Sequence, residues 1–182
     1  MAIFTKSKLS RIADSKAGYI QKSVILNEAR SFSNKYSAKT SIFLSHSHHD
    51  SEYVIDAVVL LRKMGVEVYV DWMDDSMPEE TSGKTAALLK QKIKENDKFV
   101  FLATNKSIES KWCNWEIGFG DADKYSSKKI VLFPLKDDYT DWKGNEYLKI
   151  YPYITESDYT TDYYTVVFPD GKDMSLQEWL NS

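Results

Sequence analysis

A chain of 182 residues, 42% of them hydrophobic, is long enough for one globular domain with a sizeable core. The net charge is −3 and no basic block stands out, which disfavours nucleic acid as a partner. No apolar run approaches the ~20 residues of a membrane helix, and the first residues lack the apolar segment of a secretion signal. The single cysteine, Cys113, excludes an internal disulfide, so we expect a cytoplasmic protein without a membrane partner.

Residues 1–39 are predicted to form an N-terminal helical extension. Apolar residues recur there at loosely helical spacing, at Ile20, Val24, Ile25, Leu26 and Phe32. Strand and helix signals then alternate. Residues 41–44 form a short apolar run, which is typical of a buried strand. Residues 50–65 follow with one apolar helical face, a start capped by Asp50 or Ser51, and a glycine at the end.

Three further apolar strands are expected at residues 66–70, 98–103 and 129–135, with helices between them at 84–96 and 109–125. Apolar strands separated by helices indicate a parallel sheet covered on both faces. Right-handed crossovers then give a flavodoxin-like, doubly wound α/β fold. In such folds ligands lie beyond the carboxyl ends of the strands. Those ends here are Ser45, Asp71, Thr104 and Leu135.

This core is expected to span residues 40–135. Residues 136–182 are rich in tyrosine and turn residues, and Pro169-Asp170-Gly171 marks a turn. We therefore expect an added strand or hairpin followed by a short amphipathic helix at 175–182. These elements form a C-terminal appendage packed on the core rather than a second domain.

All three histidines of the chain follow the first strand of this core, as His46, His48 and His49. The H-x-H-x-D spacing raises the possibility of a zinc site. Metallo-β-lactamase-like hydrolases need a further histidine where this chain has Ser51, and more histidines downstream. We therefore predict a strand-end loop and a helix cap at this position, and no metal.

Residues 82–85, Ser-Gly-Lys-Thr, look like the end of a phosphate-binding loop. The full motif needs a glycine five residues before Gly83, where this chain has Pro78. Nucleoside triphosphate hydrolysis is therefore disfavoured, and Lys84 is expected to be a solvated residue at the start of a helix.

A carboxylate stands among aromatic residues in the helix predicted at 109–125. Trp112, Trp115, Glu116 and Phe119 have the i, i+3, i+4 and i+7 spacing of one helical face. A buried carboxylate is costly without a partner. Glu116 is therefore expected either at the rim of the core, paired with a hydroxyl or a base, or in an aromatic-walled cleft facing the loop after the first strand.

Three motifs occur in order at the ends of the predicted strands. They are "SIFLSHSHHD" at 41–50, "VEVYVDWMDDSMP" at 66–78, and "SIESKWCNWEIGFG" at 107–120, which contains a Ser-x-Trp-Cys-x-x-Glu box. Together they resemble the bacterial Toll/interleukin-1 receptor (TIR) domain of the NAD-cleaving type, as found in Thoeris-like antiphage systems. The resemblance covers roughly residues 40–135, and "YLKIYPYI" at 147–154 is similar to the tail of some bacterial TIR-like proteins.

The resemblance implies that the protein cleaves NAD to nicotinamide and an ADP-ribose-type product, possible in linear or cyclic form, as a signal of infection. NAD is then the substrate, and neither a cofactor nor a metal is expected. Glu116 matches the catalytic glutamate. The residues implied to bind substrate are Ser45, His46, Asp71, Trp72 and Trp112.

The chemistry agrees with a single carboxylate. Nicotinamide is a cationic leaving group that departs neutral, so no general acid is required where ordinary glycosidases use two carboxylates. Positive charge develops on the ribose, and a nearby carboxylate stabilises it.

The resemblance also implies self-association through the loop after the second strand, and a separate effector protein that responds to the product. This loop departs from the family pattern, because the usual Pro-Gly appears as Met77-Pro78-Glu79. Two alternatives remain. One is a non-catalytic TIR module that acts through homotypic assembly. The other is a nucleoside deoxyribosyltransferase-like enzyme, which the Trp-Cys-x-x-Glu box disfavours.

Overall fold

A computed structural model describes residues 3–17, 23–25, 27, 39–78, 80–156 and 163–182 of the chain. Most of the helix predicted from the apolar residues at 20–32 lies outside these residues. Among the described residues, no helix is both long and apolar enough to cross a membrane.

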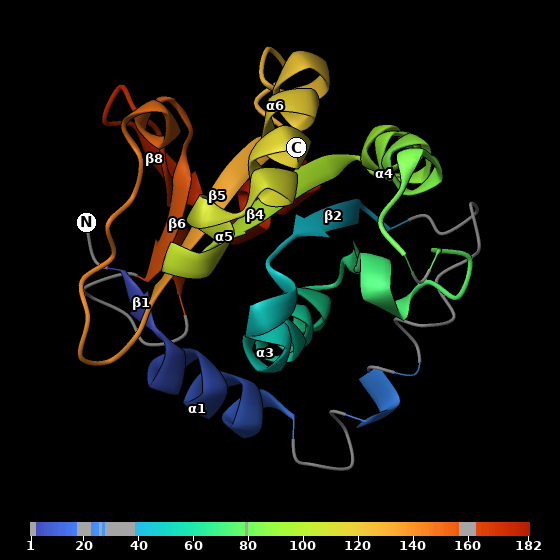
Figure 1. The fold of residues 1–182 in the computed structure, drawn as a ribbon. Helices are drawn as coiled ribbons and strands as arrows, with labels where there is room; N and C mark the ends of the chain where they lie inside the picture. Colours follow the sequence, from blue (N-terminus) through green and yellow to red (C-terminus); the bar gives the residue numbers. More distant parts are fainter. Residues whose placement is uncertain (1–2, 18–22, 26, 28–38, 79, 157–162) are drawn as a thin grey trace.

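The described strands form one sheet in the order β3-β2-β4-β5-β6-β7-β8, with β1 also paired to β5 (Figure 1). The five strands from β3 to β6 in this order are parallel to their neighbours, and β1 also joins β5 in parallel. The pairings of β6 with β7 and of β7 with β8 are antiparallel. The strands are β1 Phe4–Thr5, β2 Ser41–Ser45, β3 Glu67–Tyr69, β4 Lys98–Ala103, β5 Ile130–Lys136, β6 Tyr153–Glu156, β7 Tyr164–Val167 and β8 Asp173–Ser175.

Helices cover both faces of the sheet, with α1 and α3 on one side and α4 and α6 on the other (Figure 1). The helices are α1 Lys6–Lys16, α3 Ser51–Lys63, α4 Gly83–Glu95, α5 Asn105–Glu109, α6 Lys111–Lys124 and α7 Leu176–Asn181. Short 3-10 turns lie at His48–Asp50, Asp71–Met73 and Glu146–Ile150.

The alternation of side chains along the strands divides the core into two clusters. In β2, Ile42 and Leu44 pack with α1 and α3, whereas Phe43 packs with Leu89 of α4 and Ile117 of α6. Both faces are apolar, which explains the continuous apolar runs in the sequence. The predicted α/β fold with a mostly parallel, flavodoxin-like sheet is confirmed.

The hairpin and short helix predicted in the tail are present as β7, β8 and α7. They extend the sheet of the core, because β6 pairs with β5 and the hairpin continues from β6. The division of the chain into an extension, a core and an appendage at residues 39 and 135 stays a prediction.

The N-terminal segment is built into the sheet and the ligand edge. Lys6, at the start of α1, is 8% exposed, and its Nζ lies 2.8 Å from Asp137 Oδ1 and 3.6 Å from Asp50 Oδ1. The other oxygen of Asp50 accepts a hydrogen bond of 2.6 Å from Thr104 Oγ1, at the end of β4. Lys6 therefore supplies the countercharge for a buried carboxylate that joins the ends of two strands.

Candidate active site

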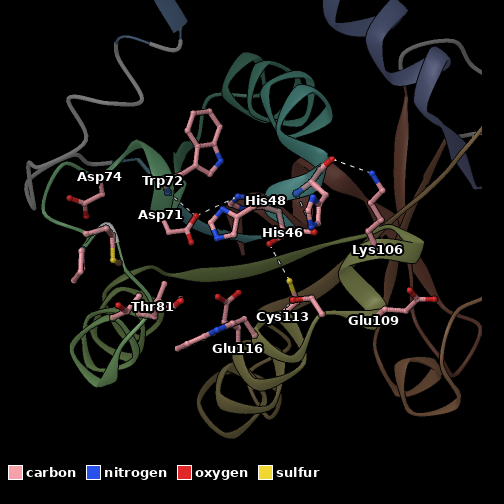
Figure 2. A pocket seen from close by; sticks show the side chains of 18 of the residues that line it. His46, His48, Asp71, Trp72, Asp74, Thr81, Lys106, Glu109, Cys113 and Glu116 are labelled. Atoms are coloured by element: carbon pink, nitrogen blue, oxygen red, sulfur yellow. Dashed lines mark hydrogen bonds and ion pairs between the residues drawn. The ribbon is translucent and has the colours of Figure 1, made fainter.

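A cavity of about 1010 Å³ opens beyond the carboxyl ends of β2 and β3, and α4, α5 and α6 line its other walls (Figure 2). This volume is at the upper end of the range of ~300–1,000 Å³ for small-molecule sites. The lining includes five of the six residues predicted to bind or cleave the substrate, which are His46, Asp71, Trp72, Trp112 and Glu116. Ser45 is buried behind them and reaches the cavity through its contact with Glu116.

Glu116 reaches the cavity because of how α6 begins and packs. The Ser110 hydroxyl accepts the N–H of Cys113 and caps the helix start. One turn after Glu116, the missing side chain of Gly120 lets the helix backbone approach the ring of Phe99 in β4. A Cβ at Gly120 would lie 2.9 Å from that ring. The close packing of α6 on the sheet thus carries the Glu116 carboxyl to the end of β2.

The Glu116 carboxyl is 5% exposed and accepts a hydrogen bond of 2.5 Å from Ser45 Oγ. Burial raises its pKa from the ordinary value of 4.5 to about 8, with the nearby negative charge of Asp71 as a smaller cause. The Ser45 hydrogen bond opposes the rise in pKa. The Glu116 carboxyl is therefore mostly protonated at pH 7. A positive charge placed beside this carboxyl favours its ionised form.

His46 forms part of the cavity wall with 7% of its surface exposed. Its Nδ1 lies 2.9 Å from Leu44 O, and its carbonyl accepts a hydrogen bond of 3.1 Å from Cys113 Sγ. Burial is the main reason that the pKa of His46 is lowered, although the negative charge of Asp71 raises it. His46 is thus held neutral near pH 7, with its Nε2 3.4 Å from Asp71 Oδ1.

Asp71 and Trp72 begin the 3-10 turn after β3. Asp71 Oδ1 accepts the Trp72 N–H at 2.8 Å, which fixes the carboxylate against the turn. Trp72 is 36% exposed at the cavity mouth. The next residue of the turn, Met73, is buried in the cluster of α1 and α3.

Trp112 is also 36% exposed and meets Trp115 edge-to-face, with ring centroids 5.4 Å apart. Trp115 stacks in turn on Phe119, at 6.2 Å. These aromatics form a partly exposed ladder along the flank of α6. Glu116 is instead buried on the sheet side of the ladder, so the four residues predicted to share one face divide between two environments.

The histidine-rich stretch forms a strand-end turn. Ser47 accepts the N–H of His49 and caps the 3-10 turn that precedes α3. Asp50 was expected to cap α3, and its side chain makes no such bond because it is engaged by Thr104 and Lys6. Within the described part of the chain, no three His, Cys, Asp or Glu side chains come together as a metal ion would require.

Several cavity residues were not selected from the sequence, and Cys113 and Lys106 are the two that bear most on the chemistry. Cys113 is buried beside Glu116, and burial raises the pKa of its thiol to about 12, so it is a neutral donor to His46 O. Its i, i+3 spacing to Glu116 was the available signal. Lys106 of α5 lies at the opposite rim, with its Nζ 3.5 Å from His49 O (Figure 2). It is an isolated lysine in the sequence and had no such signal.

This fold and cavity define a TIR domain, and the chain belongs to that family, because the family model described as "TIR domain" matches residues 42–165. A relative from Bacillus cereus (strain MSX-D12), named as a probable 3′ cyclic ADP-D-ribose synthase, ThsB′, is 34% identical over 119 residues. The match covers 63% of this chain and 60% of the relative.

A second relative, from Cytobacillus dafuensis, is named as a candidate cyclic ADP-D-ribose synthase, TIR2. It is 30% identical over 100 residues, which cover 53% of this chain and 26% of the relative. The chain thus spans 60% or less of the length of these two relatives.

Proposed function

We propose that this TIR domain is an enzyme that cleaves the bond between nicotinamide and ribose in NAD. The proposal rests most directly on one observation. A buried carboxyl, Glu116, is held by Ser45 at the end of β2, inside a cavity of dinucleotide size. The names of the two relatives support an ADP-ribose-type product, and we propose a cyclic one.

The cavity suits the charge changes of this reaction. The nicotinamide ring is a pyridinium, and its positive charge favours the ionised form of Glu116 when the substrate binds. As the ring leaves with the bonding electron pair, positive charge moves to the ribose. The carboxylate then stabilises that charge inside a site from which water is largely excluded.

The remaining lining suits the rest of the dinucleotide. The indole of Trp112 offers a flat surface on which an aromatic base can stack. The hydroxyl of Ser47, the start of α3 and the Lys106 ammonium offer donors and positive charge for a diphosphate. On this basis the nicotinamide half lies near Glu116 and the diphosphate lies toward Lys106.

We further propose that the product is a signal in antiviral defence, read by a separate effector protein. Incubation of the purified protein with NAD, followed by chromatography and mass spectrometry, tests the reaction and identifies the product. Nicotinamide should appear together with ADP-ribose or a species of its cyclic mass. NAD that remains intact under all conditions of concentration and crowding would contradict the proposal.

Glu116→Gln provides the specific test of the site. Glutamine keeps the size of the side chain and can still accept from Ser45, but it carries no charge, so NAD cleavage should fall by about 10²–10³-fold. Glu95→Gln removes an exposed carboxylate from the neighbouring helix α4, outside the cavity lining, and serves as the matched control, with activity within about twofold of the parent. A folded Glu116→Gln variant with parental turnover would assign Glu116 a structural role.

A second candidate function is a non-catalytic module that acts by homotypic assembly. The observation that favours it is the partial exposure of Trp72 and Trp112, since exposed aromatics are enriched at protein interfaces. The two functions separate in the NAD assay. A pure module would assemble without consuming NAD, and Glu116→Gln would leave its assembly unchanged.

A further inference from the structure

NAD cleavage to an ADP-ribose product, as proposed above, must release a proton whether water or a ribose hydroxyl attacks. The bond between ribose and nicotinamide breaks, and nicotinamide leaves as a neutral base with the bonding electrons. A new carbon–oxygen bond then forms to water or to a ribose hydroxyl of the same molecule. The attacking O–H has to give its proton to a base. Because the Glu116 carboxylate faces the positive charge on the ribose, a second group is needed to accept this proton.

The tautomer of His46 identifies a proton acceptor beside Glu116. Leu44 O can only accept a hydrogen bond, so the Nδ1 of His46, 2.9 Å away, carries the ring proton. In the neutral ring Nε2 then holds a bare lone pair. This atom is buried, has no hydrogen-bond partner among the described residues, and lies 3.4 Å from Asp71 Oδ1. Two acceptors therefore face each other, and one added proton turns their contact into a hydrogen bond.

Both members of this pair line the cavity, and Asp71 is the more open of the two. The Asp71 side chain is 19% exposed, whereas that of His46 is 2% exposed. Figure 2 shows Asp71 between Trp72 and His46, across the cavity from the Glu116 carboxyl. A hydroxyl group in the cavity can thus reach the Asp71 carboxylate, and a proton taken up there can be shared with Nε2 of His46.

We propose that Asp71, backed by His46, is the base that takes the proton from the attacking hydroxyl in the cleavage of NAD. Asp71 is the catalytic residue, because it meets the hydroxyl, and His46 is a positioning residue, because it acts through Asp71. Before attack the pair holds no shared proton. After attack it holds one, between Oδ1 and Nε2, and releases it to solvent through the exposed side of Asp71.

The charged and titratable groups around the pair favour this direction of transfer. The negative charge of Asp71 favours a proton on His46, and it also contributes to the raised pKa of Glu116. Asp50 also favours a proton on His46, whereas His48, with its ring 5.9 Å away, opposes it when charged. The thiol of Cys113 stays neutral, because burial raises its pKa to about 12.

Base exchange separates this role from binding and from fold. A pyridine such as labelled nicotinamide attacks the ribose through a ring nitrogen that carries no proton, so exchange into NAD needs no base. Asp71→Asn keeps the size of the side chain and can donate to Nε2 of His46. It should lower formation of ADP-ribose products by about 10²–10⁴-fold, while exchange stays within about threefold of the parent. Glu116→Gln should lower both reactions together.

His46→Gln cannot take up a proton, and it should reduce product formation relative to exchange by about tenfold. Glu80→Gln is the matched control, because it removes an exposed carboxylate from the same loop, outside the cavity lining. It should change neither rate by more than about twofold. Sodium azide, an anionic nucleophile without a proton, gives a second measurement and should restore nicotinamide release in Asp71→Asn.

The proposal is overturned if Asp71→Asn loses product formation and exchange in the same proportion, if it keeps parental product formation, or if azide restores nothing. A parent protein that never cleaves NAD would instead refute the proposed function. The two failures are therefore distinguishable in one set of assays.

Discussion

The proposed reaction needs the ionised, negatively charged form of Glu116, and burial of the side chain disfavours that form. Its pKa of about 8 means that the free protein gains the reactive carboxylate as the pH rises toward 8. A bound pyridinium lowers this pKa. The acid limb of kcat/KM, which reports the free enzyme, should therefore lie at higher pH than the acid limb of kcat. Initial rates measured from pH 5.5 to 9 check this order, and limbs at the same pH would contradict it.

The same group should make stability depend on pH. Unfolded Glu116 ionises near 4.5, whereas the folded group keeps its proton to about pH 8. Between these values the native state binds more protons, so its stability falls as the pH rises. Glu116→Gln removes this dependence. Relative to the parent, the variant should gain about 2–4 kcal/mol between pH 5 and pH 8, as measured by urea unfolding. A constant difference would mean that the folded carboxyl titrates like an exposed one.

The sequence predicted which residue types gather at the site, but not their contacts. Glu116 stood out because a carboxylate among aromatics is unusual, and Ser45 because it ends a strand. The hydrogen bond between them spans 71 residues of sequence and depends on how closely α6 approaches β2. The contact of His46 with Cys113 depends on the same approach, whereas its contact with Asp71 depends on the pairing of β2 with β3. No spacing in the sequence encodes such a distance.

Helix α6 is seated by a glycine, and this contact can be tested with a matched pair. Gly120→Ala places a Cβ 2.9 Å from the buried ring of Phe99. The variant should lose about 1–3 kcal/mol of stability, and its NAD cleavage should fall by about tenfold or more, because Glu116 lies one turn away. Gly118→Ala meets nothing within 4 Å on the same helix and should gain about 0.5–1 kcal/mol. Equal effects of the two changes would exclude this contact.

Helix α1 contributes a countercharge to the ligand edge. Lys6→Met leaves the buried carboxylate of Asp50 without its ion pair, and should cost about 3 kcal/mol in thermal or urea unfolding. Lys8→Met removes the neighbouring, more exposed lysine, which pairs with Glu156, and should cost about 1 kcal/mol or less. If Lys6→Met were as mild as Lys8→Met, the hydrogen bond from Thr104 would suffice to hold the Asp50 carboxylate.

Helices and strands whose sequence has a strong hydrophobic pattern were predicted well. Elements whose sequence has a weak hydrophobic pattern were not. The strand at 98–103 was predicted with the observed bounds, because all six residues of β4 are buried. β1 has only two residues and carries no periodic signal. α1 lies within the helical extension predicted at 1–39, but its apolar stripe is short, at Leu9, Ile12 and Ala13, so its bounds were not predicted. Their place in the fold comes from pairing with β5 and from Lys6. These are tertiary interactions that local patterns do not encode.

At the scale of the whole molecule, we expect the proposed activity to depend on self-association. Trp72 sits at the mouth of the cavity with 36% of its surface exposed, on the loop that the family resemblance associates with assembly. Specific activity should rise with protein concentration, and particle mass measured by light scattering should rise with it. Trp72→Ala should weaken both by about tenfold, since buried tryptophans dominate interface energies.

Tyr139→Ala removes a fully exposed aromatic from the segment after β5 and is the matched control. It should change neither activity nor assembly. A flat activity profile from a stable monomer would show that one chain holds the whole site.

The pairing of β1 with β5 has a consequence for synthesis. Phe4 is synthesised long before its partner, Leu135, which follows 131 positions later. Until then Lys6 has no Asp137 to bind, and Asp50 must wait for its countercharge. Contacts between such distant residues form slowly, because a long loop has to close first. A nascent chain that already contains Glu116 therefore still lacks the N-terminal support of its ligand edge, which docks only after β5 has left the ribosome.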